Sequence, residues 1–435
     1  MDRDLHALDD ALAELLLAHR RAKATLERDP GARVDTPLRD SPLLHPELFH
    51  ELGESTDPLA AALVPWLEVL LDERWAWTET TNLSALRTTP ASTPHLDDPT
   101  PIRSMIRGTL AASARGARRD FAAALCATAA ELSARAASAV EARRERAGGG
   151  RFGDVVEMET DAIATVAEAV LDRTDDLTAD AMRQGWVEGM HATLGRAADE
   201  GWPAKLTWRW TGEVLGDAGW SDGLSLALSA PPRPWGGASF GRALGEVGAA
   251  LLVAARPRTL PRALHGHPFG LRRHRAYGLF AAIVTSATFA QRVLGLGRDR
   301  ADAHARAMST AHAAALRVDA MRVLVTGALA AGRGAADERL AEVSERLFGE
   351  PLPAATLAVL PQLRPAQSAA FVGSVLSFAD RQALVERHDL DWFRNPRAAA
   401  ELRDAFERPA DLTPLPADAA ARALEALGEA LEAPF

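Results

Sequence analysis

Cysteine and tyrosine are nearly absent from this sequence, with one of each in 435 residues. The single cysteine, Cys126, excludes an internal disulfide and a metal cluster built on several thiolates. It lies in an alanine-rich stretch that is typical of a helix. We therefore interpret Cys126 as a buried, inert thiol rather than a nucleophile.

Positive charge is also scarce, because 49 Lys and Arg residues face 59 Asp and Glu residues and leave a net charge of −10. Proteins bind nucleic acids largely through an excess of positive charge, so this balance argues against such a partner. Long apolar runs are missing too, since none approaches the roughly 18 residues of a membrane-spanning helix. We expect no nucleic-acid partner and no membrane partner.

The composition that remains is that of a globular chain, with 47% hydrophobic and 25% charged residues. The acidic start, Met1-Asp2-Arg3-Asp4, leads into an amphipathic segment rather than a secretory signal, which predicts a cytoplasmic protein. The heavy use of Ala, Arg and Leu is typical of a high-GC bacterial genome. The length exceeds that of a usual single core and predicts two or three sub-domains.

Helical periodicity dominates the chain, in segments 4–27, 58–77, 102–144 and 154–195 and again from residue 271 onward. The polar, proline-containing segment 78–101 predicts a surface loop. Alternating apolar residues in segments 205–210 and 223–229 predict two strands. The sequence therefore predicts a mainly α protein with one small central β-sheet near residues 205–230.

The predicted helix over residues 239–256 bears most directly on function. Zinc peptidases carry the pattern H-E-x-x-H on a helix, because histidines at i and i+4 share one face and can hold a zinc ion beside a glutamate base. Glu246 occupies the glutamate position here, with Gly245 and Ala249 in place of the two histidines. The proton acceptor is present without the residues that would hold the metal.

The segment Ser229–Leu251, SAPPRPWGGASFGRALGEVGAAL, resembles the strand end, turn and zinc helix of gluzincin metallopeptidases. The likeness is greatest to the family of oligoendopeptidase F and thimet oligopeptidase, in which the helix usually has the pattern H-E-x-G-H followed by Ala-Leu. Gly248, Ala250 and Leu251 match that pattern. The two ligand positions do not.

Two later segments keep the order of the same family. The segment 272–280, RRHRAYGLF, is similar to the start of the helix that supplies the third zinc ligand, a glutamate, and that position falls on Arg275. The segment 367–374, QSAAFVGS, is similar to the one whose tyrosine hydroxyls stabilise the reaction intermediate, and those positions fall on Gln367 and Phe371. The resemblance covers residues 200–375, and it implies that all three ligands and both phenols are absent.

The resemblance implies a large two-lobed, zincin-like helical fold. An N-terminal helical lobe would cover residues 1–200. A zincin-like lobe over residues 201–435 would contain the small sheet, the degenerate zinc helix 239–256 and the C-terminal helices. Because Gly245, Gly248 and Ala249 leave this helix nearly bare, we expect a closed cleft floor rather than an open pocket.

Arg275 raises two alternatives for the charge of Glu246. In the first, the Arg275 guanidinium replaces the charge of the metal and pairs with a buried Glu246. In the second, Arg275 points to solvent and Glu246 pairs with Arg242, one helical turn earlier. The sequence favours neither.

Other candidate sites are weaker. Gly237-Ala-Ser-Phe-Gly241 matches the G-x-S-x-G nucleophile pattern, but no strand is predicted before it, and Ser239 is better explained as a helix N-cap. His265, His267 and His274 form the best remaining metal-like group. No carboxylate or cysteine nearby completes it, so loop histidines without a metal are the better explanation.

The sequence thus predicts a catalytically inactive metallopeptidase-like protein, with no cofactor, that binds a peptide or protein partner or acts as a scaffold. One alternative is a hydrolase or peptidase that uses a non-standard site in the same cleft, with Ser239 as the nucleophile. Another is an active metallopeptidase whose ligands lie elsewhere. The sequence gives no indication of the oligomeric state.

Overall fold

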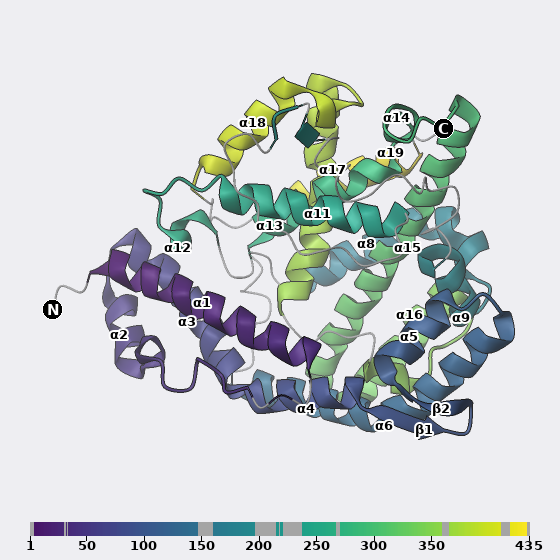
Figure 1. Ribbon diagram of the computed structural model, residues 1–435, viewed down its shortest axis with the longest axis horizontal. Coiled ribbons are helices and arrows are strands. Elements are labelled where there is room, and N and C mark those ends of the chain that lie inside the picture. Colours follow the sequence, from purple (N-terminus) through teal and green to yellow (C-terminus); the bar gives the residue numbers. More distant parts are fainter. Residues whose placement is uncertain are drawn as a thin grey trace.

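The computed structural model describes residues 4–29, 32, 34–146, 160–195, 215–216, 218–220, 237–266, 270–358, 365–409 and 418–432. Helices make up most of this part of the chain, which confirms the predicted mainly α class. Figure 1 shows α1, α2 and α3 together on the left and α11 and α13 crossing the upper middle.

The helices before residue 200 are α1 (Leu5–Arg28), η1 (Pro42–Leu44), α2 (Pro46–Glu54), α3 (Pro58–Trp75), α4 (Trp77–Thr88), α5 (Ile102–Ala111), α6 (Arg115–Arg146), α8 (Thr160–Met182), α9 (Trp186–Met190) and η2 (His191–Gly195). Those after it are α11 (Gly237–Ala254), α12 (Arg262–His265), α13 (Leu271–Ala281), η4 (Ala282–Thr285), α14 (Ala287–Arg292), α15 (Arg298–Ala328), η5 (Leu329–Ala331), α16 (Arg333–Phe348), η6 (Ala354–Ala358), α17 (Pro365–His388), η7 (Trp392–Arg394), α18 (Pro396–Glu407) and α19 (Ala419–Glu432).

Helix ends follow local chemistry where the structure shows a cap. The carboxylate of Asp4 accepts the backbone N–H groups of His6 and Ala7 at 3.0 and 3.2 Å, which starts α1. Helix α16 ends at Gly349, whose φ of 74° is the left-handed conformation that glycine adopts without strain. These ends are set by a few neighbouring residues.

The sheet in the described residues is an antiparallel hairpin of β1 (Pro90–Thr93) and β2 (Leu96–Pro101). The prediction of a surface loop over residues 78–101 is therefore wrong, because α4 and this hairpin occupy it. The helix and the hairpin both pack against α6. These tertiary contacts stabilise regular structure that the local sequence pattern does not indicate. The sheet predicted near residues 205–230 lies almost wholly outside the described residues, and of those described there, 215–216 are helical and 218–220 form a turn.

The buried core falls into separate clusters. One joins α8 to α15, α16, α17 and α19, so a helix before the predicted boundary at residue 200 shares its core with the C-terminal helices. A second surrounds α11, α13 and α14, where Trp220, Phe280 and Trp392 meet edge to face. A third lies among α1, α2 and α3.

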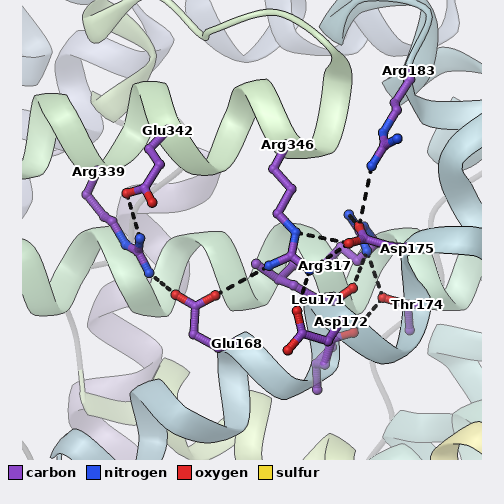
Figure 2. A network of polar contacts seen from close by, with 11 residues as sticks. Glu168, Leu171, Asp172, Thr174, Asp175, Arg183, Arg317, Arg339, Glu342 and Arg346 are labelled. Atoms are coloured by element: carbon purple, nitrogen blue, oxygen red, sulfur yellow. Dashed lines mark hydrogen bonds and ion pairs between the residues drawn. The ribbon is translucent and has the colours of Figure 1, made fainter.

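A network of charged side chains links α8, α15 and α16 (Figure 2). Arg317 of α15, which is 1% exposed, donates to the Leu171 carbonyl at 2.7 Å and forms an ion pair with Asp175. Arg346 of α16 also contacts Asp175, at 2.6 Å, and Asp172 at the same distance. Because each buried charge here has an opposite partner, we interpret the network as structural.

None of the helices in the described ranges has the length and low charge that a bilayer crossing requires. The cytoplasmic location stays a prediction.

Candidate functional site

Helix α11, which contains the segment that resembles a zinc helix in sequence, presents a row of glycines to α13. Gly241, Gly245 and Gly248 follow one another at intervals of four and three residues, so they share one helical face. A Cβ atom at Gly248 would lie 2.5 Å from the Ala276 carbonyl oxygen and 2.7 Å from Cδ2 of Phe280. The two helices therefore meet at backbone distance.

The space beside Gly245 is filled by the ring of Tyr277. A Cβ atom at residue 245 would lie 2.8 Å from both Cε2 and Cζ of that ring and 2.9 Å from Cδ2. Ala249, at the second ligand position, is 2% exposed. The face of α11 at these two positions is therefore covered by neighbouring residues.

The same close packing continues from α13 to α17. A Cβ atom at Gly278 of α13 would lie 2.5 Å from Oγ of Ser377, and one at Gly373 of α17 would lie 2.4 Å from Cβ of His274. Among the helices and strands that the structure describes, α13 and α17 have the most extensive contact, followed by α11 and α13. Helices α11, α13 and α17 form one tightly packed layer.

The hypothesis that Arg275 neutralises a buried Glu246 is wrong. Glu246 is exposed, and within the described residues it forms no ion pair with either Arg275 or Arg242. The Arg275 guanidinium instead forms a bidentate pair with Asp380 of α17, at 2.9 Å from Nε and 2.5 Å from Nη2. Asp380 was not singled out in the sequence, since nothing local relates it to Arg275.

The two positions matched to the family's tyrosines lie on α17. Phe371 is 1% exposed and belongs to the core shared with α8, so its ring takes no part in a cleft. Gln367 lies in the first turn of α17, and its side chain is outside the described residues.

Ser239 does not reach the surface. Helix α11 begins at Gly237, two residues before the predicted start, so Ser239 lies inside the first turn rather than at the N-cap, and it is 4% exposed. The predicted N-cap role is therefore wrong. A nucleophile must touch its substrate, and this hydroxyl is covered.

The three histidines do not form a metal site in the described part of the structure. His265 is buried and its Nε2 is 2.7 Å from the Phe406 carbonyl oxygen, and burial lowers its pKa. Burial, with the charge of Arg273, lowers the pKa of His274 to about 4. His267 lies outside the described residues, and within them no three His, Cys, Asp or Glu side chains are grouped as metal ligands.

The α11–α13 junction does not fit zinc either. Gly245 and Ala249 have no donor atoms, and Arg275 is a cation already paired with Asp380. Zinc needs three or four nitrogen, oxygen or sulfur ligands.

A cavity of about 520 Å³ lies directly beside this junction. Arg242 and Tyr277 line it from α11 and α13, and one face of α15 lines it with residues spaced three and four apart. Residues of α5, α6 and α9 also line it, so helices from both the N-terminal and the C-terminal part of the chain contribute to its wall. Its walls are mostly apolar, and its size is that of a small-ligand pocket.

Titratable groups in the cavity wall have shifted pKa values. Burial, reinforced by Glu246 and Asp319, raises the pKa of Tyr277 to about 12. Burial, reinforced by Arg381, lowers the pKa of His312 to about 4. Both groups are therefore uncharged near neutral pH.

Asp319 is the acidic group of the cavity. Its Oδ1 atom accepts a hydrogen bond from Nη1 of Arg322 at 2.8 Å, yet burial raises its pKa above the ordinary value. Its side chain remains 43% exposed, and since it lines the cavity, we assign that exposure to the cavity. His312, Asp319 and Arg322 share one face of α15. Their helical spacing can be read from the sequence, but only the packing of the neighbouring helices shows that this face lines a cavity.

Comparison with solved structures finds a similar overall fold. The chain is similar to a Pyrococcus furiosus carboxypeptidase in its apo-Mg form, with a TM-score of 0.55 over 99% of both chains and 12% sequence identity. No family model matches the sequence, and the search of curated proteins gives no match. At this identity the likeness concerns the fold alone.

Proposed function

We propose that this protein is a catalytically inactive relative of metallopeptidases that binds a peptide or protein partner in the cleft beside α11. The observation that carries the proposal is the Tyr277 ring at 2.8 Å from where a side chain of residue 245 would begin. A histidine at that position would have to displace the ring. The carboxypeptidase-like fold, combined with a closed ligand position, supports loss of the metal-dependent chemistry.

The chemistry itself gives a second argument. Amide hydrolysis in such a fold relies on a metal that lowers the pKa of a bound water and polarises the carbonyl group. Glu246 could accept a proton, but an unactivated water is a poor nucleophile for an amide. The exposed position of Glu246 also removes the buried environment that would tune a catalytic carboxylate.

The cavity supports the binding role. Its apolar wall can accept an apolar side chain of a peptide, and the Tyr277 hydroxyl and His312 ring have no hydrogen-bond partner in the described residues. These groups are free to bind backbone amides of a ligand. Arg242 is exposed and lines the cavity, so we place it at the mouth.

The first test is metal analysis of the purified protein, with a peptidase assay on a mixed peptide library before and after zinc addition. We expect substoichiometric metal and no cleavage. Stoichiometric bound zinc, or zinc-dependent cleavage, would show that the ligands lie elsewhere and would end the proposal.

A second test restores the site. The triple variant Gly245→His, Ala249→His, Arg275→Glu should gain little zinc affinity, because Tyr277 still fills the position. Adding Tyr277→Ala should raise that affinity markedly. If the two variants bind zinc equally, the Tyr277 ring does not block the site; if neither binds, the residue alignment is wrong.

Binding is tested by filling the cavity. Ala315→Phe places a ring in the cavity from α15, whereas Ala307→Phe places it on the exposed face of the same helix. Affinity selection from a defined library of apolar peptides should recover ligands with the wild type and with Ala307→Phe but not with Ala315→Phe. Equal recovery with all three proteins would contradict binding in this cavity.

A hydrolase with a non-standard site remains the second candidate, favoured by the shifted pKa values of His312 and Asp319 in one cavity. Ester and amide substrates should then be cleaved by the wild type and by Ser239→Ala, but not by His312→Ala. Activity that needs Ser239 would contradict this version, since that hydroxyl is buried.

A further inference from the structure

The cavity beside α11 is long as well as large. Its lining residues on α15 run from Met308 to Arg322 and recur at steps of three and four along one face of the helix. At a rise of about 1.5 Å per residue, that row extends over about 21 Å. A dry cavity of about 150 Å³ holds one benzene ring, so the 520 Å³ here offers room for roughly 20 carbon atoms in proportion. No apolar amino-acid side chain is long enough to fill it.

Charged side chains lie at one end of this row. Asp319 and Arg322 are the charged residues that α15 contributes to the wall, and Nη1 of Arg322 donates to Oδ1 of Asp319 at 2.8 Å. Tyr277 of α13 lines the same cavity and interacts electrostatically with Asp319, so its hydroxyl belongs to the same end. The other part of the row, from Met308 onward, contains one polar side chain, His312. The cavity therefore has a polar end and a longer apolar part.

The apolar part offers few hydrogen-bonding partners. The hydroxyl groups of Thr109, Thr285 and Thr356 in its wall donate to backbone carbonyls three or four residues earlier, at 2.9, 2.7 and 2.7 Å. The uncharged His312 ring packs edge to face on Phe378, with 5.5 Å between the ring centroids. A peptide extended over about 21 Å would bring about six residues and a dozen backbone polar groups. Because polar groups without partners are unfavourable away from water, a peptide backbone is a poor occupant of this part.

As a refinement that rests on the function proposed above, we propose that this cavity binds an unbranched acyl chain that lies along α15. An extended chain advances by about 1.2 Å per bond, so a length of about 21 Å matches about 14–18 carbons. Methylene groups need no hydrogen bonds, and they bury apolar surface against long side chains of the wall such as Leu125, Met190 and Phe348.

The polar end receives the carbonyl group of the acyl chain. The Tyr277 hydroxyl has no hydrogen-bond partner in the described residues and can donate to the carbonyl oxygen. The pair of Asp319 and Arg322 leaves little net charge beside it. This end therefore suits an uncharged carbonyl, such as the amide of an acylated peptide, better than an ionised carboxylate. A free fatty acid carries the same chain and is the second source to be tested.

The experiment is isothermal titration of the full chain with a short Gly-Ser peptide whose N-terminal acyl group ranges from butanoyl to eicosanoyl, below the concentration at which micelles form. The peptide without an acyl group and free palmitate are titrated in parallel. Ala315→Phe places a ring midway along the row on α15. Ala307→Phe, on the exposed face of the same helix, is the matched control.

For the wild type and the control, affinity should increase about fourfold per added methylene group and stop increasing near about 14–18 carbons, when the chain fills the cavity. Ala315→Phe should weaken binding of the long chains at least about tenfold. Tyr277→Phe keeps the ring beside Gly245 and removes the hydroxyl, so it provides a test that does not depend on the folding of Ala315→Phe. It should weaken binding of the acylated peptides about three- to tenfold at every chain length.

The ligands also separate the possible sources of the chain. Tighter binding of the acylated peptide than of palmitate would identify an acylated peptide, and equal or tighter binding of palmitate would identify a free fatty acid. Affinity that increases with chain length without a limit, or that is equal in Ala315→Phe and Ala307→Phe, would overturn the inference. Apolar peptides that bind in the cavity and gain nothing from acylation would overturn it while the proposed function stands. If neither peptides nor acyl chains bind there, both are wrong.

Discussion

Replacing Gly245 by alanine tests the contact on which the functional proposal depends. The added Cβ atom would lie 2.8 Å from two carbons of the Tyr277 ring. Favourable carbon–carbon contacts lie near 3.5–4.0 Å, so either the ring or the helix must shift. Overpacking of this kind costs about 1–3 kcal/mol, whereas alanine gains about 1 kcal/mol over glycine inside a helix. The net loss of unfolding free energy should be about 0–2 kcal/mol.

The effect of Gly245→Ala should differ when the same substitution is made in the Tyr277→Ala variant. In Tyr277→Ala the obstructing ring is absent, so Gly245→Ala should increase the unfolding free energy by about 1 kcal/mol through helix propensity alone. The coupling between the two positions should therefore be about 1–3 kcal/mol. Gly248→Ala is the matched control, because its Cβ atom would meet the Ala276 carbonyl oxygen at 2.5 Å, a backbone contact that Tyr277→Ala does not relieve.

Urea unfolding of the four proteins of this cycle, followed by circular dichroism, measures the coupling, provided that the denaturant slope stays constant. The reasoning is refuted if Gly245→Ala has the same effect in both backgrounds, within about 0.5 kcal/mol. In that case the Tyr277 ring would not occupy the space beside residue 245. The proposed block of the ligand position would then lose its basis.

Three further predictions follow from titratable and charged groups. Arg317→Met should lower the unfolding free energy by about 3 kcal/mol in urea, because it removes the most buried of the three arginines that pair with Asp175; no change would mean that Arg346 and Arg183 suffice. Burial alone would raise the pKa of Asp175, but hydrogen bonds from Arg346 and Arg317 hold it below 3.8, so its stabilisation is present above that pH and disappears as pH falls through the lower, folded value. Asp175→Asn should therefore flatten the acid limb of stability against pH, and an unchanged limb would contradict the shift. Tyr277 is the single tyrosine of the chain, so near-ultraviolet absorbance follows it alone, and its phenol should ionise near 12 rather than 10.0 while circular dichroism shows a folded protein.

Much of the fold could be predicted because helical periodicity is a local property. The spacing of apolar residues in segments such as 58–77 and 102–144 predicts helices, and α3 and α6 lie there. The errors fall where local pattern is weak. Segment 78–101 is polar and contains prolines, yet packing against α6 orders it as a helix and a hairpin. Ser239 was placed at a helix start that lies two residues too late.

The candidate site also has features that the sequence predicts and features that it does not. The absence of ligand atoms at Gly245 and Ala249 follows from the residue types and needs no structure. The sequence also shows small residues on one helical face, and small residues permit close approach of another helix. The missing ligand atoms and the capacity for close helix packing are therefore properties of the sequence alone.

Only the tertiary structure decides what meets that face. Tyr277 lies 32 residues after Gly245, and Asp380 lies 105 residues after Arg275, so no local signal pairs them. The premise that Glu246 is buried failed for this reason, because the sequence does not say which face of α11 is covered. The cavity likewise arises from helices distant in the chain. Spacing sets which residues share a face, but packing alone determines which faces meet.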